Sequence, residues 1–339
     1  MRSLPSIALV THPTRLEGLR RRWGTLGQAQ FLLAMAHAQE DAQRAGTSAT
    51  KATVSRKARH AQVRQPQQAD FDEYRQEDSV YRQVVDQLEN ELQFGLPVKR
   101  VDRSFIANFD FGTCEVVVVV GQDGLVANTA KYVGNIPIVA VNPDPKRIDG
   151  VLLPFQVREA GLAVRRVLNG KYQKRPVTLA EVNLNDGQKM LAFNDFFIGA
   201  GSHVSARYQL EFAGRTEPQS SSGILVSTGA GSTGLLSSVF NMAGGLAQFL
   251  GTEVEARPAI TWEDRKLVWA VREPFISKRS QASLVAGWLE ERQELVIESL
   301  MPDGGVIFSD GIEQDFLPFT SGTIARVSVS EQQANLVVQ

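Results

Sequence analysis

A run of five consecutive valines, Val116–Val120, places the tightest constraint on how this chain can fold. β-Branched side chains favour strands, and a strand that is apolar at every position suits a sheet covered on both faces. The run ends at the turn Gly121-Gln122-Asp123-Gly124, after which a short helical segment, 125–133, leads to a second apolar strand, 136–141. This order of strand, turn, helix and strand predicts a βαβ unit in a parallel sheet.

The rest of the first half fits the same α/β pattern. The apolar run Ile7–Val10 indicates a buried strand. Apolar residues at three- and four-residue spacing predict helices over about 15–44 and 71–94, and a third helix, 157–168, that stops at a glycine. The polar stretch Ala45–Gln68 offers almost nothing to bury, so we expect a mobile insertion there.

The pattern changes after Pro176. Short alternating segments separated by turn residues are typical of an antiparallel β-domain. The segments are 177–184, 189–198, 208–212, 266–271, 294–299 and 324–329. We therefore expect an α/β domain over 1–172, with the insertion around 45–70, a β-domain over 173–330 and a C-terminal tail over 331–339.

Length, charge and cysteine content exclude several classes of protein. A chain of 339 residues exceeds what one core usually organises, which agrees with two domains. The formal charge of −1 argues against a broad nucleic-acid-binding surface, and no window approaches the ~18 apolar residues of a membrane helix. The single cysteine, Cys114, permits no internal disulfide, in keeping with a reducing compartment and a cytoplasmic location. If the protein binds phosphate, the groups that hold it must therefore come from the binding site itself and not from a broad basic surface.

The turn that ends the valine strand is the first candidate site. Gly121 and Gly124 let the backbone come close to a phosphate, and a helix start offers unpaired N–H groups to an anion. Asp123 projects where the strand ends, which is the place where open parallel sheets bind ligands, and could hold a metal ion or accept a proton. The alternative is an ordinary strand-to-helix turn capped by Asp123.

A second candidate is the small-residue segment Ser227–Gly234, set between an apolar strand, 224–226, and a helical segment, 235–250. Small residues clear space, and hydroxyls and amides supply donors to phosphate or ribose oxygens. A flexible linker is the alternative.

Two further motifs lie in the β-domain. Asn194 and Asp195 interrupt an apolar strand, where they either meet a ligand such as a sugar hydroxyl or form a bulge or hairpin tip. Asp310-Gly311 between strands indicates first of all a hairpin turn.

Together these motifs resemble, in order and spacing, the NAD kinase family, which is related to the diacylglycerol and sphingosine kinases. The resemblance extends from Ile7 to about Ser328. It implies a Rossmann-like parallel α/β domain followed by a β-sandwich domain. It also implies phosphoryl transfer from ATP, or in some members polyphosphate, to the 2′-hydroxyl of the adenosine ribose of NAD or NADH, commonly with Mg²⁺. A homo-oligomer, dimer or tetramer, is expected as well.

The resemblance assigns roles to individual residues. Asp123 falls on the catalytic aspartate and is the candidate magnesium ligand. Nucleotide-binding roles fall on the turn residues Gly121, Gln122 and Gly124, on Asn142 after the next strand, on the pair Asn194 and Asp195, and on Thr228, Ser232 and Thr233 of the small-residue segment.

This chain departs from the family pattern at several positions. Gln122 replaces a glycine, Leu125 a threonine and Ser222 an acid, while Asn142-Pro143 opens a stiffer loop in place of a glycine-rich turn. Because the acceptor side differs most, two alternatives stay open. One is a related phosphotransferase with another hydroxyl acceptor, and the other is a non-catalytic dinucleotide-binding regulatory protein.

Overall fold

Strand β3 (Cys114–Val120) lies inside a parallel group of strands in a computed structural model that describes residues 4–32, 35, 66–252 and 258–339. The order of this group is β4 (Pro137–Asn142), β3, β1 (Ser6–Thr11) and β2 (Val98–Asp102), and the two-residue β5 (Phe155–Gln156) pairs with β4. All neighbouring pairs are parallel. The predicted βαβ unit is therefore confirmed.

Helices cover both faces of these strands, as the five buried valines require. Val117 and Val119 pack with α4 (Asp123–Ala130) on one face. Val116, Val118 and Val120 pack on the other face with α3 (Pro66–Glu91) and α5 (Val157–Leu168). Two short 3₁₀ helices, η1 (Arg103–Asn108) and η2 (Phe111–Thr113), lie between β2 and β3.

The first predicted helix is interrupted at residues 24–25, and the chain is helical again over 26–32 and at residue 35. Helix α1 (Arg15–Trp23) begins at a capping box on Thr14 and ends at Gly24, whose φ of +79° favours glycine and closes the helix. Most of the expected insertion, up to residue 65, lies outside the described residues. The end of that range, from Pro66, is already part of α3.

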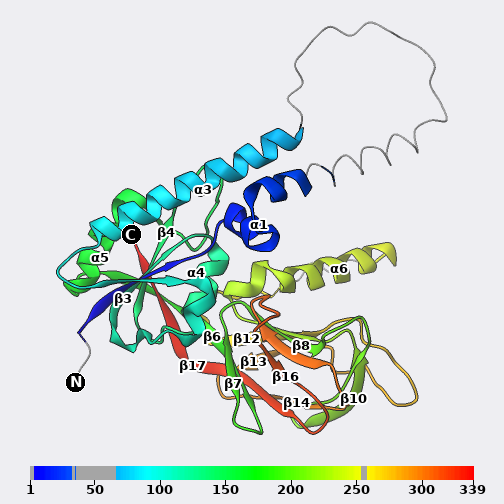
Figure 1. The fold of residues 1–339 in the computed structure, drawn as a ribbon. Helices are drawn as coiled ribbons and strands as arrows, with labels where there is room; N and C mark the ends of the chain where they lie inside the picture. The colour runs from blue at the N-terminus through cyan, green and yellow to red at the C-terminus, as the bar shows by residue number, and fades with distance from the viewer. Residues whose placement is uncertain (1–3, 33–34, 36–65, 253–257) are drawn as a thin grey trace, which may run out of the picture.

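The second half forms two packed antiparallel layers (Figure 1). One layer continues the first sheet, and its strands are β6 (Gln173–Leu184), β7 (Lys189–Ala192), β9 (Ala206–Phe212), β10 (Arg215–Ser221), β14 (Leu295–Ser299) and β17 (Ile324–Val338). The other is a six-stranded sheet of β8 (Asp195–Ala200), β11 (Ile224–Ser227), β12 (Lys266–Val271), β13 (Ala286–Glu290), β15 (Gly305–Ser309) and β16 (Phe316–Pro318). One buried cluster joins the facing sides of the two layers. The expected fold class, a parallel α/β domain followed by a β-sandwich, is confirmed.

Strand β17 departs from the expectation for the end of the chain. Residues 331–338, expected to form a tail, continue this strand, which pairs antiparallel with β6 and, near its end, parallel with β4. The reason is that Leu336 and Val337 are apolar and become buried between these two partners. The first sheet thus runs unbroken through both halves, and the domain limits at 172 and 330 stay predictions.

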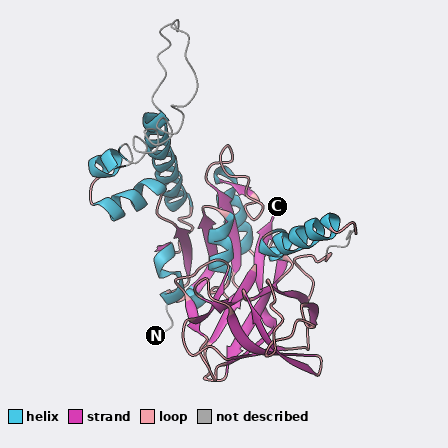
Figure 2. Ribbon diagram, turned by 90° about the vertical axis from the view of Figure 1, so that its right-hand side faces the viewer, coloured by secondary structure: helices cyan, strands magenta, loops and turns pink. Residues whose placement is uncertain are grey.

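Helix α6 (Leu235–Phe249) follows the 3₁₀ turn η3 (Ala230–Thr233) and extends along the strand-rich half (Figure 2). Leu236 packs on the outer face of the six-stranded sheet. No helix within the described part of the chain is both long and apolar enough to cross a membrane.

Candidate functional site

Asp123 is the first residue of α4, where β3 has just ended. Its Oδ2 accepts a hydrogen bond from the Val151 amide and its Oδ1 one from the Leu152 amide, both at 3.0 Å. Asp123 therefore does not cap its own helix, as the alternative interpretation required. The N-cap is Gln122, which makes no side-chain capping bond, so the carboxylate ties the helix start to the loop before β5.

The glycines of the same turn have different environments. A Cβ on Gly121 would lie 2.8 Å from Cδ2 of His12, so this glycine is required by the close approach of the end of β1. A Cβ on Gly124 would meet nothing within 4 Å, and Gly124 is exposed. The side of the turn that faces outward is therefore open to a ligand.

Asn142 shapes the loop after β4. It is 5% exposed, its Nδ2 donates to the Ile148 carbonyl at 2.9 Å, and its Oδ1 accepts from the Asp144 amide at 3.0 Å. Both polar ends are thus used within the loop, and its expected nucleotide-binding role stays a prediction.

A cavity of about 420 Å³ lies at the carboxyl ends of β1, β3 and β4. This is the edge at which open α/β sheets bind ligands. It is lined by His12, Arg15, Glu73, Glu77, Val80, Tyr81, Gln122, Pro143, Asp144, Arg147 and Ile148. Gln122 connects this cavity to the turn that carries Asp123.

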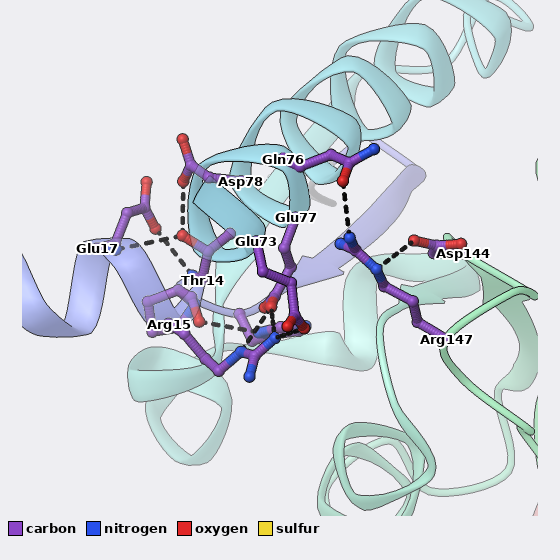
Figure 3. Close-up of polar contacts among 11 residues, drawn as sticks. Thr14, Arg15, Glu17, Glu73, Gln76, Glu77, Asp78, Asp144 and Arg147 are labelled. Carbon is purple, nitrogen blue, oxygen red and sulfur yellow. Dashed lines mark hydrogen bonds and ion pairs between the residues drawn. The ribbon is translucent and has the colours of Figure 1, made fainter. Parts of the chain in front are cut away.

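Polar contacts with side chains of α3 involve both arginines that line this cavity (Figure 3). Arg15 contacts Glu73 at 3.1 Å and Glu77 through its Nε at 2.6 Å. Arg147 donates to Gln76 at 3.0 Å. Both arginines of the lining are thus already engaged by side chains of α3.

A second cavity, of about 680 Å³, lies between η1, α4 and the loop that joins β15 to β16. Asn128 and Tyr132 line it from the side of α4, and Gly311–Asp315 line it from the β-sandwich. The Tyr132 hydroxyl donates to Asp315 at 2.6 Å and joins the two walls. This second cavity therefore has one wall from the α/β half and one from the β-sandwich.

Asn194 and Asp195 lie where the predicted strand 189–198 is broken into β7 and β8. The Asp310 carboxylate accepts the amides of Phe193, Asn194 and Asp195 at 3.2, 2.6 and 3.3 Å. The Thr228 amide donates to the Asn194 carbonyl at 2.9 Å. Three of the four sequence motifs therefore meet through direct hydrogen bonds.

Asp195 is the group with the most perturbed ionisation in this region. Burial, and then the negative charge of Asp310, raise the pKa of Asp195 to about 7. Among the described residues none donates a hydrogen bond to its carboxylate, and the side chain is half-buried. Such a carboxyl can exchange a proton near neutral pH and is free to bind a hydroxyl.

Residues of the small-residue segment make hydrogen bonds and close contacts within the protein itself. Thr228 is fully buried, and its hydroxyl donates to the Phe193 carbonyl at 2.6 Å. Ser232 donates to the Gly229 carbonyl at 2.7 Å, while Thr233 is exposed. A Cβ on Gly231 would lie 2.2 Å from the Asn194 carbonyl oxygen, so that glycine allows the segment to lie against the strand break. The expected ligand contacts of Thr228, Ser232 and Thr233 stay predictions.

An apolar cluster connects Asp123 to the other motifs. It includes Leu125 of α4, Leu152 of the loop bound by Asp123, and Phe193 at the strand break. Within the part of the chain that the structure describes, no group of three or more His, Cys, Asp or Glu residues is arranged to hold a metal ion. Asp123, the candidate magnesium ligand, is thus not part of such a group.

The sequence interpretation missed two features of this region. Asp310 and Gly311 do form the expected hairpin turn, with φ of +55° and +71°, but the Asp310 carboxylate also organises the strand break. Lys131, one residue beyond α4, was not singled out, although its Nζ lies 3.3 Å from Asp310 with both side chains buried. The sequence signal that could have pointed to this buried lysine is its position next to an apolar helical segment.

Known proteins similar to this chain were found by sequence and by fold. No protein-family model matches the chain. The NAD kinase of Psychrobacter arcticus is 33% identical over 144 residues, which are 40% of this chain and 42% of that protein. The chain thus matches less than half the length of this curated relative.

The fold is similar to the crystal structure of yeast NADH kinase complexed with NADH. The match has a TM-score of 0.54 and 13% sequence identity, and covers 100% of this chain and 84% of that one. It supports the α/β domain followed by a β-sandwich. Over these 144 residues the chain is therefore similar in sequence to an NAD kinase, and its fold is similar to that of an NADH kinase.

Proposed function

We propose that this protein transfers a phosphoryl group from ATP to the 2′-hydroxyl of the adenosine ribose of NAD or NADH. The observation that carries the proposal is the placement of Asp123 at the open edge of the parallel strands, linked by one apolar cluster to the strand break with Asn194 and Asp195. The similar proteins support it, since one is named NAD kinase and the other is an NADH kinase with NADH bound.

In the proposed reaction, Asp123 orients the 2′-hydroxyl and takes its proton. Each of its oxygens accepts one backbone amide and keeps a further lone pair for the hydroxyl. A bond forms between the 2′-oxygen and the γ-phosphorus, the bond from that phosphorus to the β,γ-bridging oxygen breaks, and ADP leaves. Catalysis of this kind rests mainly on positioning and on neutralising charge.

The acceptor is held by the strand break in this proposal. The Asn194 amide and Asp195 carboxyl hydrogen-bond sugar hydroxyls, while Ser232, Thr233 and the turn residues Gly121, Gln122 and Gly124 border the phosphates. Magnesium ions usually bind through one or two carboxylates together with substrate phosphates, and Asp123, which belongs to no larger group of possible ligands among the described residues, fits that pattern. When bound, the ion would be held by Asp123 and the donor phosphates and would neutralise their charge.

The test is a product assay with ATP, Mg²⁺ and either NAD or NADH, in which the 2′-phosphorylated dinucleotide is separated and quantified. Asp123→Asn is expected to lower kcat by about 10²- to 10⁴-fold. Asp110→Asn is the matched control, because Asp110 also accepts a backbone amide, from Gly112 at 3.0 Å, but at η2. Absence of product with both dinucleotides, or an unchanged rate in Asp123→Asn, would refute the proposal.

We also propose a cytoplasmic homo-oligomer, dimer or tetramer. The support is at the end of α6, where Leu246, Phe249 and the C-cap residue Leu250 are 56%, 85% and 76% exposed. Exposed apolar residues gathered in one place often mark a protein interface. Light scattering coupled to size-exclusion chromatography measures the mass, and a monomer at micromolar concentration would contradict this part.

A further inference from the structure

Lys131 carries a buried positive charge at the end of the helix that starts with Asp123. Its side chain is 2% exposed, and its Nζ donates to the Ser309 hydroxyl at 2.8 Å and pairs with Asp310 at 3.3 Å. A lysine is almost never fully buried unless it is paired, because removing the ammonium from water is unfavourable. This pair therefore constrains the positions of both partners.

Asp310 transmits this constraint to the strand break. Its side chain is 3% exposed, and besides Lys131 its oxygens bind the three successive amides of Phe193, Asn194 and Asp195. The Asp310 amide in turn donates to the Asp195 carbonyl at 2.9 Å. The turn that carries Asp310 and the strand break thus form one hydrogen-bonded unit.

Helix α4 connects this unit to the candidate catalytic group. Asp123 is its first residue and Lys131 follows its last, so eight residues, or about 12 Å of helix, separate the two ends. The contact between Lys131 and Ser309 joins segments 178 residues apart in the chain. One end of the helix carries Asp123 of the proposed site of phosphoryl transfer, and Lys131 at the other end is bound to the Asp310 turn, which in turn binds the strand break.

We propose that Lys131, acting through Asp310, is a positioning residue that fixes Asn194 and Asp195 relative to Asp123 and so sets the affinity for the dinucleotide. This inference rests on the proposed function. Lys131 touches no reacting atom in this proposal. Loss of its charge lets the Asp310 turn shift, and displacements of about 1 Å at a binding site can lower rates by about 10²-fold.

The test compares Lys131→Met, which keeps the aliphatic stem, with Lys131→Arg, which keeps the charge. Calorimetry measures the Kd of NAD and NADH without a donor, and the product assay measures KM for the dinucleotide and for ATP separately. Lys131→Met is expected to weaken dinucleotide binding about tenfold or more, with KM for ATP within about twofold of the wild type. Lys131→Arg is expected to restore binding to within about threefold of the wild type.

Lys99→Met is the matched control. Its Nζ also donates to a hydroxyl, that of Thr113 at 3.2 Å, but at β2 and away from the strand break. If Lys131→Met does not fold, Ser309→Ala removes the hydroxyl acceptor while both charges stay, and is expected to weaken dinucleotide binding about threefold. Unchanged binding in the folded variant, or an equal loss for ATP and dinucleotide, overturns the inference.

The two proposals fail in different ways. Product formation by the wild type with unchanged dinucleotide binding in the Lys131 and Ser309 variants overturns the inference alone. A wild type that binds the dinucleotide without forming product overturns the proposed function. In that case a tenfold weaker Kd in Lys131→Met still supports the positioning role.

Discussion

Replacing Asp195 by asparagine is expected to stabilise the fold, and to do so more strongly as the pH rises. Burial and the charge of Asp310 raise the pKa of this carboxyl from 3.8 to about 7. The folded protein therefore keeps a proton on Asp195 over a pH range in which the unfolded chain has lost it. The contribution of Asp195 to stability must then fall as the pH rises from about 4 to about 7, and stay level above that. Asparagine does not ionise, so the variant does not lose this stability as the pH rises.

The magnitude follows from the two pKa values. A pKa difference of one unit corresponds to about 1.4 kcal/mol, so the change from 3.8 to about 7 amounts to at most about 4 kcal/mol above pH 7. At pH 5 only the interval from 3.8 to 5 contributes, because the folded protein still keeps its proton there, and the same linkage gives about 1.5 to 2 kcal/mol. The gain from Asp195→Asn should thus grow by about 2 to 3 kcal/mol between pH 5 and pH 8.

Urea unfolding of the wild type and the variant at pH 5 and pH 8 measures this difference. Asp186→Asn is the contrasting control, because hydrogen bonds from Gln188 lower the pKa of the exposed Asp186, so its ionised form contributes stability that is lost as the pH falls. That variant should be destabilised at neutral pH. A gain from Asp195→Asn that is equal at both pH values, or a loss that grows with pH, would show that Asp195 does not bury its charge in this way.

Four further variants test other parts of the structure. Gly231→Ala should lose about 3 kcal/mol or more in thermal unfolding, because its Cβ would lie 2.2 Å from the Asn194 carbonyl, whereas Gly124→Ala meets open space and should lose little. Tyr81→Phe should lose about 1 to 3 kcal/mol in urea unfolding, since the buried hydroxyl bridges the ends of β1 and β3, and an unchanged midpoint would contradict this. Arg15→Gln should change stability by less than about 1 kcal/mol, because its ion pairs with α3 are exposed, and a larger loss would contradict that estimate.

Most of the secondary structure could be predicted because the signals are local. The valine run, the alternation after Pro176 and the glycine at residue 170 act within one strand or helix. The end of α1 at Gly24 was missed because the apolar spacing continues past a residue whose positive φ breaks the helix. The last part of β17 was missed because the polar residues 331–333 interrupt the strand pattern. The sequence does not show that β6 and β4 both pair with the residues beyond them.

The candidate site was predictable residue by residue but not in its connections. Asp123 lies at the edge expected from the βαβ pattern, and the motifs around Asn194 and Thr228 do meet. Lys131 and Asp310 could not be paired from the sequence, because nothing local signals a contact across so much of the chain. The role of Gly231 could not be predicted either. In the sequence, a glycine that makes room for a ligand cannot be distinguished from one that makes room for a backbone carbonyl.

The pairing of β17 with β4 has a consequence for how the chain acquires its fold during synthesis. Asn335 and Leu336 lie opposite Pro137 and Ile138. This part of β4 therefore has no partner on that side until the ribosome has made nearly all of this sequence. Contacts between distant segments form slowly, and an unpaired strand edge invites pairing with other chains. Nascent chains that stall before β17 should therefore be the species that most need chaperones.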